Sequence, residues 1–276
     1  MTWRTAAIAI ASIALLLVLV IGLRRWVNHA RLELTPVIVP AVMKSSDVLD
    51  PPAPAIARRM ADDVRDALHT PQRPRLIALT FDDGPYPVTT PALLRQLRRL
   101  NVPATFFLIG RDAREQPAIS QALGVGPDDI GNHTFTHPEM ATIDAPAQSL
   151  EIADGALALQ RATGRTPLYF RPPHGNFNAL TIDAARGNNE TVALWDIDPG
   201  DWRHINAASI IDNVTTHARA PAVILLHNGS TATIDALPAI VRAYRAAGFE
   251  FVTLSELARR VPLEQINTPV AVEVRS

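Results

Sequence analysis

The stretch Leu76–Gly84, with the sequence LIALTFDDG, contains the pattern that decides the fold. Its apolar and β-branched part, Leu76–Phe81, predicts a short β-strand. Two carboxylates, Asp82 and Asp83, follow the strand directly, before a glycine and a proline. A chemically reactive pair therefore stands at the carboxyl end of a predicted strand, and this arrangement recurs along the chain.

Further short apolar runs follow at regular intervals. They are Ala104–Ile109, Asp129–His133, Leu168–Arg171, Val192–Asp198, Val223–His227 and Phe249–Leu254. Helix-like segments lie between them: Thr90 begins one, Asp144 begins another that ends at Gly164, and Ser255 begins the last. Alternating strands and helices predict parallel strands with crossover helices. We therefore expect an α/β fold, either a distorted, incomplete (β/α) barrel of about seven strands or an open doubly wound sheet.

Polar residues at the ends of these runs favour the barrel and locate its site. They are Asp82, Asp83, His133, Arg171, Asp198, Asp201 and His227. In a β/α barrel the loops at the carboxyl ends of the strands converge on one catalytic mouth. Residues that are scattered in sequence are therefore expected to meet there.

Two histidines and one carboxylate in this set suit a metal ion. The motif His133-Thr134-Phe135-Thr136-His137 sets two imidazoles four residues apart, which would bring them to one side of a helical turn. If the chain stays extended, the side chains of Asp82 and Asp83 point to opposite sides, so that one can ligate a metal and the other act as a base. Two histidines and a carboxylate with an open position are typical of catalytic zinc. An ordinary turn at Asp83 and a pair of surface histidines are the alternatives.

The remaining motifs offer charged and apolar partners. Arg171 precedes two prolines and His174, and an arginine beside a carboxylate favours its ionised form; a surface arginine is the alternative. For His174 we expect the backbone N–H to matter more than the imidazole. His227, beside a carboxylate, can serve as a general acid. Trp202 would form an apolar wall or belong to the core.

Composition limits the partners and ligands. The 276 residues carry a formal net charge of −1, which gives no electrostatic footprint for nucleic acid, so we expect no nucleic-acid partner. The chain has no cysteine, which excludes disulfides and thiolate metal sites. His, Asp and Glu remain as the metal ligands.

Five motifs in order resemble those of the NodB-homology polysaccharide deacetylases, carbohydrate esterase family four. They are Thr80–Gly84, His133–His137, Arg171–Gly175, Asp198–Trp202 and Val223–His227. The resemblance covers about residues 75–262. It implies metal-dependent hydrolysis of N-acetyl groups from an N-acetylglucosamine-containing cell-wall or exported polysaccharide, with release of acetate.

The resemblance also implies a metal site and a base. Asp83, His133 and His137 are implied to bind one divalent ion, with zinc expected and cobalt or a similar ion as the alternative. Asp82 is implied to be the catalytic base, held by Arg171.

The same resemblance implies an acid and a substrate pocket. His227 is implied to be the acid, tuned by Asp201. Trp202 and Leu225 are implied to line the acetyl pocket, and the backbone N–H of His174 to help bind the oxyanion.

The sequence departs from the family pattern at two positions. His174 stands where relatives often have tyrosine, and Asn228 where an aspartate often follows the acid histidine. Neither change removes a catalytic atom. An esterase acting on O-acetyl groups of a glycan such as acetylxylan is one alternative function. A non-catalytic glycan-binding module is another, but it should have lost Asp82, Arg171 or His227.

The N-terminal run Ala6–Leu23 predicts one transmembrane helix. It has eighteen residues and no charge, and at about 1.5 Å per residue it just spans a hydrocarbon core of about 30 Å. A cleaved signal peptide and a buried core helix are the alternatives. Positive charges are nearly balanced across the run. The tail before the run is short and the spacer after it is extended. Both features favour a membrane-anchored protein whose catalytic domain lies outside the cytoplasm, in the periplasm or at the cell surface. If the run is cleaved, we expect a secreted protein instead.

These features divide the chain into five parts. They are a short tail over 1–5, a membrane anchor over 6–23, a proline-rich spacer with a short helix over 24–74, a polysaccharide deacetylase domain over 75–262, and a tail over 263–276.

Overall fold

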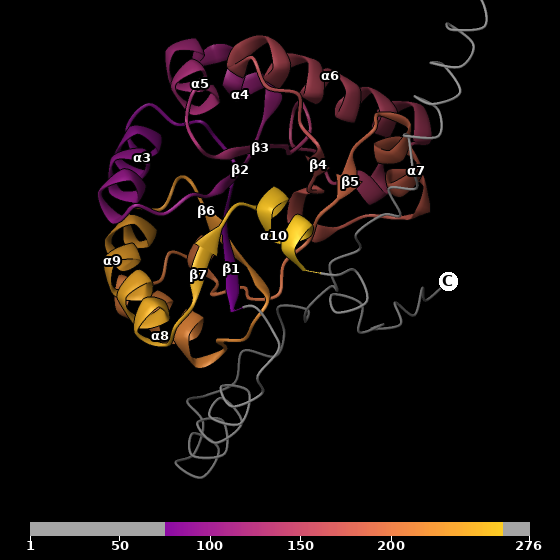
Figure 1. The fold of residues 1–276 in the computed structure, drawn as a ribbon. Coiled ribbons are helices and arrows are strands. Elements are labelled where there is room, and N and C mark those ends of the chain that lie inside the picture. Colours follow the sequence, from indigo (N-terminus) through magenta and orange to yellow (C-terminus); the bar gives the residue numbers. More distant parts are fainter. Residues whose placement is uncertain (1–74, 262–276) are drawn as a thin grey trace, which may run out of the picture. The chain divides into compact units, whose positions relative to one another are not determined.

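A curled parallel sheet organises the described residues, 75–261, of the computed structural model (Figure 1). The strands run in the order β5-β4-β3-β2-β1-β6, and β7 also pairs with β1. Their bounds are β1 Leu76–Asp82, β2 Thr105–Leu108, β3 Asp129–Asn132, β4 Tyr169–Phe170, β5 Thr191–Val192, β6 Ala222–His227 and β7 Glu250–Val252. Every strand pair is parallel, as the alternation of strands and helices predicts.

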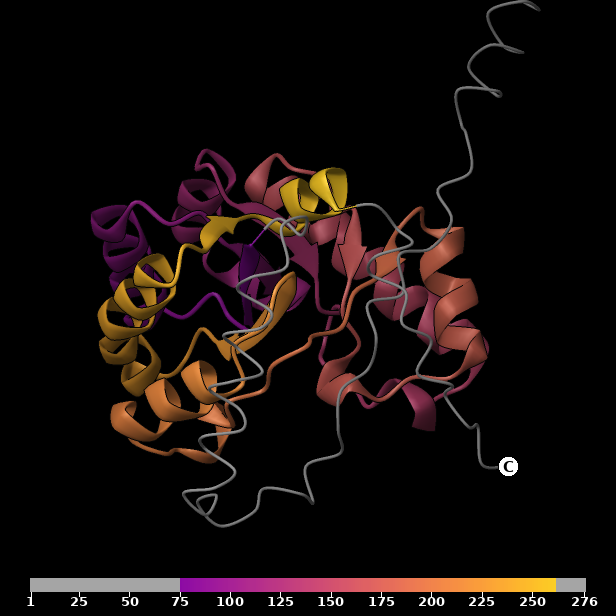
Figure 2. The ribbon, with the colours of Figure 1, turned by 60° about the horizontal axis from the view of Figure 1, so that its bottom comes forward.

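Helices surround this sheet, and Figures 1 and 2 show most of them at its periphery. The α-helices are α3 Thr89–Leu100, α4 Gly110–Glu115, α5 Pro117–Gly124, α6 Ala145–Thr163, α7 Ala179–Gly187, α8 Ala207–Thr216, α9 Thr231–Ala246 and α10 Leu254–Arg260. Three short 3-10 helices are η1 Met140–Thr142, η2 Pro173–Gly175 and η3 Asp201–Arg203. The described residues thus form a half-barrel, which agrees with a distorted, incomplete (β/α) barrel.

Helix α6 begins and ends where the sequence predicts. The Asp144 side chain accepts a hydrogen bond from the Ala147 N–H at 2.9 Å, and Gly164 ends the helix in the left-handed conformation. Helix α3 begins at Thr89, one residue before the predicted Thr90. Helix α10 begins at Leu254 because Thr253, rather than Ser255, caps it.

The alternation of side chains along β1 positions the first catalytic candidate. All seven residues of β1 are buried. Ile77, Leu79 and Phe81 belong to a core cluster that also includes residues of α3 and α9, whereas Leu76 and Ala78 pack in a second cluster with residues of α10. Because side chains alternate along a strand, Asp82 continues the row on the α10 side, the inner face of the sheet.

The predicted strand Val192–Asp198 is wrong for most of its length. Strand β5 contains only Thr191 and Val192, and beyond it Ile197 forms a single bridge with Ile224 of β6. The physical reason is the Arg171 guanidinium, which donates to the carbonyls of residues 193 and 194 and so occupies groups that a longer strand would use.

The predictions for the two ends of the chain lie outside the described residues. These predictions are the transmembrane helix over Ala6–Leu23, the short helix of the spacer and the tail over 263–276. Within residues 75–261, no helix is both long enough and apolar enough to cross a bilayer.

Candidate active site

The candidate residues gather at the carboxyl ends of the strands. Asp82 ends β1 and His227 ends β6, and these two residues are paired in register. His133 follows β3, and Arg171 follows β4. The mouth of the half-barrel therefore contains an acidic, a basic and two imidazole side chains, as the placement of polar residues in the sequence predicts.

Asp83, His133 and His137 form a cluster suited to a metal ion. Their ligand atoms all lie within 4.8 Å of one another. The Asp83 Oδ1 atom is 3.3 Å from His137 Nε2 and 3.7 Å from His133 Nε2. In a tetrahedral site with bonds of about 2.0–2.1 Å, neighbouring ligand atoms are about 3.3–3.4 Å apart. The three side chains therefore fit a small divalent ion with little movement.

The surroundings of both histidines favour ligation through a ring nitrogen. His133 Nδ1 lies 2.7 Å from the Arg171 carbonyl oxygen, which can only accept, so Nδ1 carries the proton and Nε2 is free to ligate. Burial and the neighbouring His133 lower the pKa of His137. Each ring is thereby prepared to donate a lone pair.

The His133–His137 turn is not helical, which corrects the predicted geometry. Thr134 and His137 both have φ of 68°, in the left-handed region. The Thr134 hydroxyl accepts a hydrogen bond from the His137 N–H at 2.9 Å and closes the turn. The two rings still meet, with centroids 4.9 Å apart, but a tight turn brings them together.

The extended chain that would point Asp82 and Asp83 to opposite sides is not found. Asp83 has φ of 73°, so the chain is not extended there and its carboxylate turns toward the mouth. Asp82 Oδ2 is 3.8 Å from His133 Nε2, and Asp83 Oδ1 is 3.7 Å from the same atom. Both carboxylates thus face one imidazole, and they differ in what holds them.

Asp82 is held by a fully buried arginine. Arg171 Nη1 donates to Asp82 Oδ1 at 2.7 Å and to the Thr80 hydroxyl at 2.8 Å. The guanidinium carbon also lies 4.0 Å from the centre of the Phe107 ring and 5.5 Å from that of Trp195. One oxygen of Asp82 is therefore fixed, and the other remains directed at the mouth.

His227 is paired with the buried carboxylate of Asp201. Nδ1 of His227 lies 2.7 Å from Asp201 Oδ1, and Asp201 Oδ2 accepts the backbone N–H of His227 at 2.8 Å. Burial alone would lower the pKa of His227. The hydrogen bond and the charge of Asp201, with the more distant charges of Asp82 and Asp83, outweigh burial and raise this pKa to about 9.

The three predicted substrate contacts differ in exposure. Trp202 is 44% exposed, with Arg203 stacked on its ring at 4.7 Å, so it is not a core residue. Leu225 is buried in β6. His174 is exposed, has φ of 59°, and packs its ring edge-on against His137 at 4.9 Å.

Several supporting residues were not predicted. Thr233 of α9 donates to Asp201 Oδ2 at 2.6 Å. Asn228 is fully buried, donates to the Asp83 carbonyl at 3.4 Å and accepts from the Thr90 hydroxyl at 2.9 Å. Thr80 could have been found, since it is two residues before Asp82 on the same face of β1. The helix residues carry no comparable signal in sequence.

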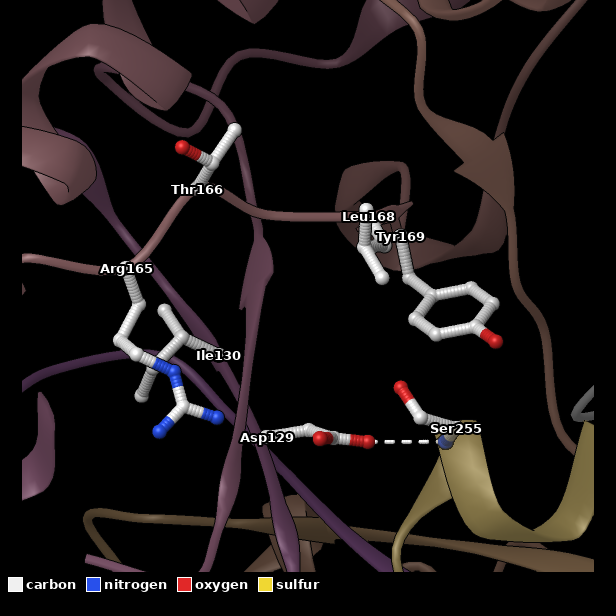
Figure 3. A pocket seen from close by; sticks show the side chains of 7 residues that line it. All are labelled: Asp129, Ile130, Arg165, Thr166, Leu168, Tyr169 and Ser255. Atoms are coloured by element: carbon white, nitrogen blue, oxygen red, sulfur yellow. Dashed lines mark hydrogen bonds between the residues drawn. The ribbon is translucent and has the colours of Figure 1, made fainter. Parts of the chain in front are cut away.

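A pocket of about 170 Å³ lies away from this cluster, where β3 and β4 begin (Figure 3). Its lining residues are Asp129, Ile130, Arg165, Thr166, Leu168, Tyr169 and Ser255. Asp129 accepts the backbone N–H of Ser255 at 2.8 Å, which ties α10 to the sheet. None of the candidate catalytic residues lines this pocket, and it lies at the opposite ends of the strands from the mouth.

A parallel half-barrel whose mouth holds paired carboxylates, two histidines that could ligate a metal and a third histidine with a raised pKa contains the groups that a hydrolase needs. Comparison with known proteins identifies the family. A polysaccharide deacetylase family model matches residues 69–193. A peptidoglycan-N-acetylglucosamine deacetylase of Bacillus cereus is 35% identical over 195 residues, covering 68% of this chain and 91% of the relative.

Two further relatives agree. A chitooligosaccharide deacetylase of Azorhizobium caulinodans is 33% identical over 188 residues, covering 63% of this chain and 90% of the relative. The solved structure of the peptidoglycan deacetylase PdaC from Bacillus subtilis superposes with a TM-score of 0.63 at 32% identity, covering 67% of this chain and 91% of that one. The chain belongs to the polysaccharide deacetylase family, carbohydrate esterase family four, as the three named deacetylases do.

Proposed function

We propose that this chain removes N-acetyl groups from an N-acetylglucosamine-containing polysaccharide of the cell wall or an exported glycan, using one divalent metal ion, with zinc as the expected ion. The observation that carries the proposal is the cluster of Asp83, His133 and His137 beside the arginine-held Asp82. The named relatives act on peptidoglycan or on chitooligosaccharides, and N-acetylglucosamine is common to both substrates.

Asp83, His133 and His137 would hold the ion. When bound there, a divalent ion supplies a Lewis acid for the acetyl carbonyl and makes a water molecule more acidic. Asp82 would take the proton from that water, since its Oδ1 is engaged by Arg171 and its Oδ2 is directed at the mouth.

His227 would donate the proton to the departing amine. Its Nδ1 is engaged by Asp201, which leaves Nε2 to face the substrate. The raised pKa keeps the ring protonated at neutral pH. We assign the oxyanion contact to the backbone N–H of His174, and the walls of the acetyl pocket to Trp202 and Leu225.

The test is product analysis with a panel of glycans. The full-length protein is incubated with chitooligosaccharides, peptidoglycan and acetylxylan, and both acetate and new primary amine are quantified. We expect equal amounts of acetate and amine from an N-acetylglucosamine-containing glycan. Acetate without amine, obtained only from acetylxylan, would replace the proposal with an O-acetyl esterase.

Metal dependence is tested separately by chelation. Exhaustive chelation should abolish acetate release, and zinc or cobalt should restore it, because the three ligands leave a position open for water. Full activity in protein shown by elemental analysis to contain no metal would refute this part of the proposal.

We also propose that the catalytic domain, assigned to residues 75–262, lies outside the cytoplasm and is tethered by Ala6–Leu23. The apolar run, the proline-rich spacer and the location of cell-wall glycans support this topology. A reporter fused after Ser276 that is active only in the cytoplasm would contradict the proposal.

A further inference from the structure

The turn between His133 and His137 needs support from outside itself. It follows β3 but forms neither helix nor strand, and two of its residues have positive φ. Non-glycine residues in this region are strained and persist only where the surroundings fix them. The position of two proposed metal ligands therefore depends on what holds the turn.

Glu151 of α6 accepts three hydrogen bonds from the middle of this turn. Its Oε2 atom accepts the backbone N–H groups of Phe135 at 3.0 Å and Thr136 at 2.8 Å. Its Oε1 atom accepts the Thr136 hydroxyl at 2.7 Å. All three donors lie between the two histidines, so one carboxylate fixes the backbone that joins the two ligands.

Helix α4 also holds this turn, by donating backbone N–H groups to the carbonyl groups of the turn. The N–H groups of Gly110 and Arg111 donate to the carbonyls of Thr134 and Phe135 at 2.9 and 3.0 Å. Figure 1 shows α4 beside α6, and a Cβ atom at Gly155 would lie only 2.8–3.0 Å from the Thr134 carbonyl group. The glycine thus permits the close approach that brings Glu151 within reach.

We propose that Glu151 is a positioning residue for the metal site, an inference that rests on the proposed function. Glu151 does not belong to the cluster of possible ligands, and its two oxygen atoms are engaged by the turn. It acts through the backbone: it holds His137 at the distance from Asp83 that suits an ion. Without it, two backbone N–H groups lose their acceptor, and the ligand set is no longer preorganised.

Glu151→Ala tests the proposal, with Asp154→Ala as the matched control. Asp154 lies one turn further along α6 and is exposed, so its replacement removes the same charge and leaves the turn intact. Zinc affinity is measured on the full-length protein by competition with a chromophoric chelator. We expect Glu151→Ala to bind zinc about 10–100-fold more weakly, a typical cost of removing a supporting group, and Asp154→Ala to bind as the wild type does.

A second readout separates positioning from general stability. In the metal-free protein, amide exchange of Phe135 and Thr136 measured by NMR should accelerate in Glu151→Ala, while exchange in β1 and α9 stays unchanged. Cobalt-loaded Glu151→Ala should also show an altered visible spectrum, because the ligand geometry differs. If Glu151→Ala does not fold, Glu151→Gln, which keeps one acceptor oxygen, should show a smaller loss of affinity and faster exchange at the same two amides.

Two outcomes would overturn the proposal, and they differ from failure of the proposed function. Zinc affinity in the Glu151 variants equal to that of Asp154→Ala would show that the carboxylate does not position the ligands. Unchanged exchange at Phe135 and Thr136 would show that it does not hold the turn. Failure of the wild-type protein itself to bind zinc would instead refute the metal-dependent function.

Discussion

Replacing Asp201 by asparagine should move the alkaline limb of the pH–activity profile to lower pH. Asp201 raises the pKa of His227 to about 9 through a 2.7 Å hydrogen bond and its negative charge. A histidine with a raised pKa is protonated below that value, and its acid function is lost as the pH rises through it. Without the carboxylate, burial and the ordinary value place the pKa at about 6.5 or lower.

The magnitude follows from these two pKa values. At pH 7.5 a group of pKa about 9 is about 97% protonated, whereas one of pKa about 6.5 is about 9% protonated. Asp201→Asn should therefore lose at least roughly tenfold in kcat/KM at pH 7.5 from protonation alone. A bound divalent ion lowers the pKa of His227 in the wild type and in Asp201→Asn alike. The quantity to compare is therefore the difference in pH between the alkaline midpoints of the two proteins.

The assay is acetate release from a chitooligosaccharide between pH 5 and 10. Asp235→Asn, which removes an exposed carboxylate from α9, is the control for net charge and should keep the wild-type alkaline limb. If the alkaline midpoints of Asp201→Asn and the wild type coincide, His227 is not the acid that Asp201 tunes.

Three further predictions concern stability, each measured by denaturant unfolding. Burial raises the pKa of Glu190 from 4.5 to about 8, so between these pH values the folded state holds a proton that the unfolded state has lost. The free energy of unfolding, relative to that of Glu190→Gln, should therefore fall as the pH rises from 4.5 to 8. A difference between the two proteins that does not change with pH would contradict this. Gly175→Ala should lower the free energy of unfolding by at least about 1–2 kcal/mol, because φ of Gly175 is +65° and a Cβ atom there would lie 2.6 Å from the Trp195 ring. An unchanged free energy of unfolding would show that this strain is absent. Thr80→Val should cost about 1–3 kcal/mol, since a buried N–H of Arg171 loses an acceptor, and a neutral result would show that another group replaces it.

Much of the architecture could be predicted because parallel strands and crossover helices leave strong signals. The run Leu76–Phe81 and the capping residues Asp144 and Gly164 are local features, and they lie where the sequence places them. The region after Val192 was wrong because its carbonyl groups bind a side chain, Arg171, that is distant in sequence. Local patterns carry no information on such a contact.

The candidate site, like the fold, could be predicted only in part from the sequence. Its residues could be found because they follow strands that end at one mouth, and the structure brings them together. The turn at His133–His137 was predicted as helical because spacing alone cannot reveal positive φ at Thr134. Glu151 and Thr233 come from helices whose contacts depend on packing, so neither was found.

Parallel measurement of bound metal and acetate release in Asp82→Asn and Asp83→Ala tests the central proposal most directly. Asp82→Asn should retain one metal ion and lose turnover by about 10²–10⁴-fold, because it removes a positioned base and leaves the ligands in place. Asp83→Ala should lose both the metal and the activity. Loss of metal in Asp82→Asn together with its retention in Asp83→Ala would contradict the assignment, as would undiminished turnover in Asp82→Asn.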